Sequence, residues 1–218
     1  MQVDLRVTRL LCSTICHDVM NKLANLSLGL ETLKDEEPTT ESLNLVVQEG
    51  EMATKQLAFF RIAFGNGTGE SGLTGKDGIK EARKIATQLL EINNINLAWD
   101  DSRDDLLVPV ANRLALKLIL NVIHCVGACV FRNGQITTRI ENIDGDIGVL
   151  FTGTGPVARL RPDFLRALYR ESNIEDLTAQ TAPAWYTSCL AEEIKSEVDA
   201  HDTGGAVQFA VVLPVKKD

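Results

Sequence analysis

The sequence lacks the long apolar run that a membrane-spanning helix requires. No uncharged apolar stretch approaches the roughly 20 residues needed to cross a bilayer. The N-terminal residues carry a charged or polar side chain every few positions, which argues against a secretory signal peptide. We therefore expect a protein of the cytoplasm with no membrane partner.

The sequence also lacks clustered positive charge and metal-binding motifs. Its 22 Lys and Arg face 30 Asp and Glu, and the scattered cations exclude the basic stripe that nucleic-acid binding needs. Five cysteines form no CxxC motif, and only three histidines are present, so we predict no bound metal. The pairs Cys12/Cys16 and Cys125/Cys129 are expected to be buried free thiols of a reducing compartment.

Residues 5–33 form a long amphipathic segment. Around a helical wheel with His17 at zero, a mostly apolar stripe lies opposite the histidine, which predicts a helix. The stripe contains Leu5, Thr8, Leu11, Cys12, Ile15, Val19, Lys22, Leu23, Leu26, Gly29, Leu30 and Leu33. Pro38 ends this helix, and Thr39 or Thr40 can cap a second one over about 41–64. Because a lone hairpin cannot bury both apolar faces, we expect two chains to form a homodimeric four-helix bundle.

A glycine-rich segment divides the chain, with five glycines in residues 65–75. We predict a hairpin over 1–64, a connector over 65–75 and a second domain over 76–218. The second domain is expected to have helices at 77–92, 109–126, 161–170 and 181–198, and strands at 95–99, 135–142, 146–152 and 206–214. This pattern predicts an α+β protein whose second domain is an α/β sandwich with helices on one face of the sheet.

His17 lies on the face of the first helix that points away from the apolar stripe. A solvent-facing imidazole is largely neutral near pH 7, and its unprotonated nitrogen is a nucleophile that can accept a phosphoryl group. Asp18 can accept a hydrogen bond from one ring nitrogen and so leave the other free to attack. Asn21, one turn later, can orient a phosphoryl oxygen or a water. The alternative is an ordinary solvated histidine on a helix surface.

Three segments resemble one known family. Residues 15–23 (ICHDVMNKL) resemble the H-box of two-component histidine kinases and phosphotransferases. Residues 60–65 (FRIAFG) resemble a FxRxAFG segment, and residues 155–162 (GPVARLRP) resemble a GPxARLRP segment, of the ChpT-type histidine phosphotransferases. The three matches follow the family's order, so the resemblance covers nearly all of the chain.

The resemblance implies a histidine phosphotransferase of a two-component phosphorelay. A phosphoryl group would arrive at His17 from the receiver domain of a hybrid kinase and leave for response regulators, with Asp18 and Asn21 completing the catalytic site. The receiver would supply Mg²⁺, and this chain would hold no cofactor of its own. The residues expected to bind the receiver are Ser13, Thr14, Met20, Ala24, Leu28, Arg159 and Arg161. Arg159 and Arg161 have a second interpretation, which is pairing with nearby carboxylates.

The second domain resembles the ATP-binding domain of histidine kinases in a degenerate form. Asn121 matches the asparagine that such a domain uses for metal and phosphates, but Phe151 stands where an aspartate would contact adenine. Residues 181–189 contain no glycine where a second glycine-rich loop is expected. We therefore predict no ATP-dependent autokinase activity. A true histidine kinase and a non-catalytic scaffold remain the two alternatives.

Overall fold

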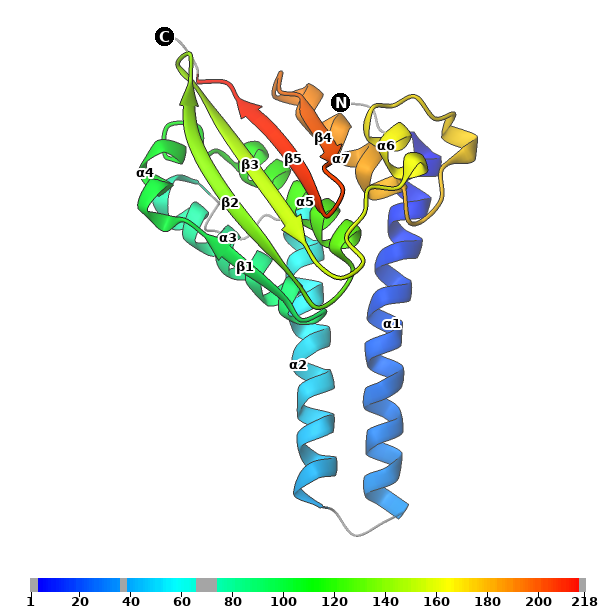
Figure 1. The fold of residues 1–218 in the computed structure, drawn as a ribbon. Helices are drawn as coiled ribbons and strands as arrows, with labels where there is room; N and C mark the ends of the chain where they lie inside the picture. The colour runs from blue at the N-terminus through cyan, green and yellow to red at the C-terminus, as the bar shows by residue number, and fades with distance from the viewer. Residues whose placement is uncertain (1–3, 36–38, 66–73, 216–218) are drawn as a thin grey trace.

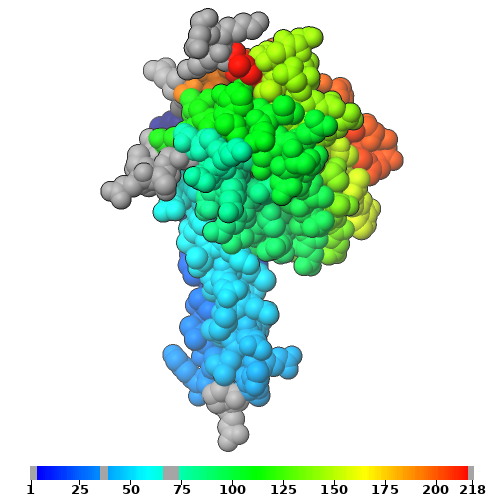
Figure 2. All heavy atoms as spheres, turned by 90° about the vertical axis from the view of Figure 1, so that its left-hand side faces the viewer, coloured from blue at the N-terminus to red at the C-terminus, as the bar shows by residue number. Residues whose placement is uncertain are grey.

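The computed structural model describes residues 4–35, 39–65 and 74–215, which form a helical hairpin and an α+β domain beside one end of it (Figure 1). In the hairpin, α1 (Leu5–Asp35) lies against α2 (Thr40–Ala63). The lower part of the hairpin projects beyond the second domain (Figure 2). Pro38 and most of the predicted connector, at 66–73, lie outside the described residues.

The start of α2 is fixed by a capping box. Thr39 Oγ1 accepts a hydrogen bond from Ser42 N at 3.1 Å, and Ser42 Oγ accepts one from Thr39 N at 3.1 Å. These two bonds satisfy backbone donors that a helix start leaves unpaired. The predicted cap at Thr39 is therefore confirmed.

The apolar stripe of α1 is wider than α2 can cover. Leu11 and Val19 are buried, and a Cβ at Gly29 would lie 2.8 Å from Val46 Cγ2, so the two helices approach closely there. Leu23 and Leu30 remain 39% and 45% exposed. A second exposed apolar set on α2 contains Leu43, Val47 and Leu57, which share one helical face.

The second domain is a five-stranded mixed sheet with helices packed on one side (Figure 1). Its elements are α3 (Gly75–Glu91), β1 (Ile95–Trp99), η1 (Asp101–Arg103), α4 (Asp104–Leu107), α5 (Arg113–Val130), β2 (Gly134–Ile143), β3 (Asp146–Thr154), α6 (Pro162–Leu168), η2 (Ile174–Asp176), α7 (Ala182–Glu193), β4 (Val198–Asp202) and β5 (Ala206–Leu213). The strand order is β1-β2-β3-β5-β4, with β1 parallel to β2 and all other neighbours antiparallel. The predicted α+β class is confirmed.

The helix α5 forms the centre of the core. Its length and composition would suffice to cross a membrane, but 72% of it is buried inside the protein. On β2, Ile136, Thr138 and Ile140 alternate inward against this helix layer, while their neighbours face outward. This period of two is typical of a sheet with one packed face.

Two predicted helices of the second domain have wrong boundaries, and the first of them ends at Val130 and not at 126. The helix expected at 109–126 begins at Arg113, because Asn112 Oδ1 caps it by accepting from Leu114 N and Ala115 N. The helix expected at 181–198 ends at Glu193, and Lys195 then takes a left-handed φ of 58° that reverses the chain. The strand β4 that follows was not predicted. It has only five residues, two of them apolar and facing inward, so its alternation of apolar and polar side chains is too short to recognise.

Candidate functional site

The structure brings the three predicted catalytic residues together on the open side of α1. His17 has a side chain that is 73% exposed, and its Nδ1 lies 3.2 Å from Asp18 Oδ1. The Nδ2 of Asn21 lies 3.4 Å from the same nitrogen. Both neighbours lie beside Nδ1, which can either donate to the Asp18 carboxylate or accept from the Asn21 amide. Within the described part of the chain, Nε2 has no hydrogen-bond partner.

The carboxylate of Asp18 sets the tautomer of His17. A carboxylate can only accept, so this contact is a hydrogen bond in the tautomer whose Nδ1 carries the proton. This charge-assisted bond is stronger than the neutral contact with Asn21 that the other tautomer would make. That tautomer leaves the lone pair on Nε2, which has no hydrogen-bond partner among the described residues.

The second domain covers α1 up to one turn before His17. Val7 is fully buried, and Arg6 Nε donates to the carbonyl of Ile174 in η2 at 2.9 Å. One turn before the histidine, Thr14 Oγ1 donates to the carbonyl of Ala179 at 2.8 Å. The second domain therefore contacts α1 close to His17 but leaves the imidazole ring exposed to solvent.

Most of the residues expected to bind a receiver lie around the histidine. Ser13 and Ala24 are exposed, and Met20 and Leu28 keep 60% and 65% of their surface in solvent. Thr14 is partly buried because of its bond to the second domain. Met20 lies one turn from the histidine and Leu28 three turns, so both are exposed apolar side chains on the face of α1 that carries His17.

Arg161 reaches the same face through a loop that sequence reasoning missed. Its Nη1 donates to Gln180 Oε1 at 3.0 Å, and Gln180 follows the residue that contacts Thr14. Arg161 also pairs with Asp163 at 3.3 Å, whereas Arg159 is exposed and its backbone N donates to the carbonyl of Cys129 at 3.2 Å. No sequence pattern marks this loop, since a distance of 165 residues separates its contact from Thr14.

The interface between the hairpin and the second domain, called the dock below, consists largely of aromatic side chains. Phe59, Phe60 and Phe64 at the end of α2 surround His124 of α5, with ring centroids 5.6, 6.3 and 5.9 Å from the imidazole. Tyr186 of α7 packs on Phe64 at 5.5 Å. The FRIAFG segment therefore forms the surface on which the second domain sits.

The stability of this dock is expected to fall in mild acid. Burial lowers the pKa of His124 from 6.5 to about 4, with Asp18 opposing the shift. Because the unfolded chain then takes up a proton before the folded one, the stabilisation present above pH 6.5 is lost as pH falls toward 4. We expect urea unfolding to show a loss of about 1–2 kcal/mol between pH 7 and pH 5 that His124→Gln removes. An unchanged pH dependence in that variant would contradict this assignment.

The positions that resemble a nucleotide site are mostly buried in the second domain. Phe151 is fully buried in β3, 6.5 Å from the Trp99 ring, and Asn121 is fully buried in α5. A Cβ at Gly153 would lie 2.6 Å from Val130 Cγ2, so this glycine permits the sheet to approach α5. Most of the segment 181–189 is a buried helix.

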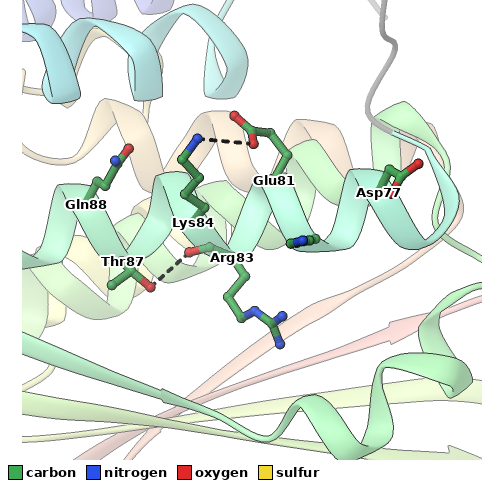
Figure 3. Close-up of a pocket in the computed structure, with 7 residues that line it drawn as sticks. Asp77, Glu81, Arg83, Lys84, Thr87 and Gln88 are labelled. Carbon is green, nitrogen blue, oxygen red and sulfur yellow. Dashed lines mark hydrogen bonds and ion pairs between the residues drawn. The ribbon is translucent and has the colours of Figure 1, made fainter.

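A pocket lies along α3 (Figure 3). It is lined by Asp77, Lys80, Glu81, Arg83, Lys84, Thr87 and Gln88. Arg83 pairs with Asp104 at 3.2 Å and Lys84 with Glu81 at 3.7 Å. None of the predicted site residues lines it.

The cysteines divide into two groups. Cys125, Cys129 and Cys189 are buried, and burial raises the pKa of Cys125 and of Cys129 to about 12. Cys12 and Cys16 are exposed on α1, so their predicted burial is wrong. Cys12 lies on a part of the apolar stripe that α2 does not cover, and Cys16, next to His17, lies outside the stripe. Among the described residues, no group of three His, Cys, Asp or Glu side chains could hold a metal ion.

Comparison with known proteins identifies the family of this chain. Residues 79–206, more than half of the chain, match the family model described as histidine phosphotransferase C-terminal domain. The chain therefore belongs to the histidine phosphotransferases of two-component phosphorelays. It is similar to the protein phosphotransferase ChpT of Brucella abortus (strain 2308), with 29% identity over 201 residues and 92% of each chain covered.

Solved structures show the same fold. A bacterial phosphotransferase structure matches with a TM-score of 0.77 and 25% identity, covering 97% of this chain and 98% of that one. The histidine kinase ThkA, solved in complex with the response regulator protein TrrA, matches with a TM-score of 0.53 and 13% identity over 97% of this chain and 64% of its own. The latter likeness concerns the fold alone.

Proposed function

We propose that this chain relays a phosphoryl group between receiver-domain aspartates through Nε2 of His17. The observation that carries the proposal is the exposed imidazole whose Nδ1 is held by Asp18 at 3.2 Å. The relative ThkA was solved with a response regulator, which supports a receiver as the partner class. We place this relay in the cytoplasm, where receivers act.

The chemistry is an in-line displacement at phosphorus. The Nε2 lone pair forms a bond to the phosphorus of a receiver phosphoaspartate, and the bond from phosphorus to the aspartyl oxygen breaks. The leaving carboxylate keeps the electron pair, and the positive charge that develops on the ring is stabilised by Asp18. A carboxylate of the next receiver reverses the step. The receiver supplies Mg²⁺ at its own carboxylates, and this chain needs to bind no metal or nucleotide.

The receiver would contact two parts of this chain. On α1 it would cover Ser13, Met20, Ala24 and Leu28 around the histidine, all of which are exposed. On the second domain it would meet Arg161, together with the loop at Gln180, and the exposed Arg159. Guanidinium groups suit the acidic surface that surrounds a receiver aspartate.

The second part of the proposal is a homodimer. The hairpin exposes more apolar side chains than a monomer in solution would be expected to show. They are Leu23 and Leu30 of α1 and Leu43, Val47 and Leu57 of α2. A second hairpin packed against them would complete a four-helix bundle core. Sedimentation of the intact chain at twice the monomer mass is the expected result, and a monomer at micromolar concentration would refute it.

The direct test of the relay uses a hybrid-kinase receiver labelled on its aspartate. Mixed with this chain, it should lose label to the chain, and a second receiver should then take the label from the chain. A control with labelled ATP in place of the receiver should leave the chain unlabelled. Label from ATP would favour a kinase, and flow between receivers without labelling of the chain would favour a scaffold.

Asp18 is expected to contribute through one charge-assisted hydrogen bond. The Asp18→Asn variant keeps the side-chain size but loses the carboxylate that holds Nδ1–H, and transfer from a receiver should slow by about 10- to 100-fold. Glu31→Gln, a neutralisation at an exposed site on the same helix, serves as the control. Rapid-quench measurement of labelled His17 gives the rate, and equal rates in Asp18→Asn and wild type would remove Asp18 from the mechanism.

A further inference from the structure

Two polar side chains of α5 reach across to the end of α2. The Nδ2 of Asn121 donates to the carbonyl of Ala63 at 2.8 Å, and Lys117 Nζ donates to the carbonyl of Gly65 at 3.1 Å. In Figure 1, α5 lies against the upper end of α2. The last carbonyls of a helix have no partner within it, so the second domain supplies the cap of the hairpin.

These two contacts lower the free energy of unfolding relative to an apolar interface. Asn121 is fully buried, and its Oδ1 has no hydrogen-bond partner among the described residues. Lys117 is 9% exposed, and burial lowers its pKa. A buried amide oxygen without a partner and a desolvated ammonium both cost free energy that an apolar dock would avoid. Their presence indicates that the dock must adopt one defined geometry, since hydrogen bonds are directional and apolar contacts are not.

The packing of the second domain on α2 determines where the part of the receiver site that lies on the second domain is positioned relative to His17. The same domain that Asn121 holds carries the loop whose Ala179 carbonyl meets Thr14, and Gln180 of that loop holds Arg161. His17 belongs to the other part of the chain. A receiver that contacts both therefore senses any rotation of one part against the other.

We propose that Asn121 is a positioning residue for phosphotransfer, which holds the second domain on α2 so that a bound receiver presents its aspartate in line with His17. The inference rests on the proposed relay. In this inference Asn121 positions the second domain through its hydrogen bond to Ala63, without a bound nucleotide. Lys117 supports it through the neighbouring carbonyl.

The test compares two asparagines of α5 in the intact chain. Asn121→Ala removes the bond to Ala63, whereas Asn112→Ala removes the cap of the same helix and touches no residue of the hairpin. Each variant is phosphorylated in parallel by phosphoramidate, a small donor that needs no docking, and by a phosphorylated receiver. Hydrogen exchange at the end of α2 reports whether the dock has loosened.

Asn121→Ala should accept phosphate from phosphoramidate at the wild-type rate and lose about tenfold or more in kcat/KM with the receiver, while Asn112→Ala keeps both. Lys117→Met should show the same split to a smaller degree, and it serves if Asn121→Ala fails to fold. Equal losses in Asn121→Ala and Asn112→Ala would overturn the inference, as would normal receiver transfer in Asn121→Ala with faster exchange in α2. A wild-type chain that takes phosphate only from phosphoramidate would instead refute the relay itself.

Discussion

The His17→Gln variant is expected to take up no label from a phosphorylated receiver domain, while the wild-type chain becomes labelled within the same mixing time. Glutamine keeps a polar side chain of similar length but has no ring nitrogen with a free lone pair. Because His17 is 73% exposed at its side chain, the substitution should change the free energy of unfolding by only about 0.5 kcal/mol. Loss of labelling with an unchanged melting temperature would locate the effect in the chemistry.

A second exposed histidine provides the matched control for this experiment. His201 on β4 has a side chain that is 68% exposed, and its Nε2 lies 2.8 Å from Asp199 Oδ2. It therefore shares the exposure and the carboxylate neighbour of His17 but lies outside α1. His201→Gln should be labelled as fast as wild type. Label that persists in His17→Gln and disappears in His201→Gln would show that the wrong histidine has been assigned.

Phe151→Asp is expected to unfold the second domain without creating an ATP site. The ring is fully buried beside Trp99, so the substitution removes a core side chain and buries a charge with no cation partner. Together these effects should lower the free energy of unfolding by about 5 kcal/mol or more. Thermal unfolding followed by circular dichroism gives the loss, and equilibrium binding of ATP gives the second readout.

Phe151→Leu is the control for Phe151→Asp. It keeps an apolar side chain and should cost about 1–2 kcal/mol, so the chain stays folded. A folded Phe151→Asp variant that binds ATP would contradict our account, because it would show that an aspartate is all that the second domain lacks. Binding is not expected, since Asn121 is already bonded to Ala63.

The hairpin and the open face of His17 could be predicted because both follow from local periodicity. The period of apolar residues fixes the helix, and His17 stands opposite the stripe, as its exposure confirms. Cys12 was assigned wrongly because a helical wheel places it on the apolar face but does not say how much of that face one neighbouring helix covers, whereas Cys16 lies outside that face. The exposure of Cys12, Leu23 and Leu30 on the apolar stripe is the structural reason to expect a second hairpin.

The dock and the part of the receiver site that lies on the second domain could not be predicted from the sequence. The bond from Asn121 to Ala63 spans 58 residues, and the bond from Thr14 to Ala179 spans 165 residues. Contacts of this kind depend on how the two parts pack, which no local pattern encodes. The resemblance of Asn121 to a nucleotide ligand identified the position but not its contact, because a changed environment gives the same amide a different partner.

The central claim is that Asp18 holds Nδ1 of His17 and leaves Nε2 free to accept the phosphoryl group. Nuclear magnetic resonance of the phosphorylated, 15N-labelled chain, which couples phosphorus to the ring nitrogens, tests this claim most directly. We predict one phosphohistidine, at His17, with phosphorus bonded to Nε2. Phosphorus on Nδ1, or on any residue other than His17, would contradict it.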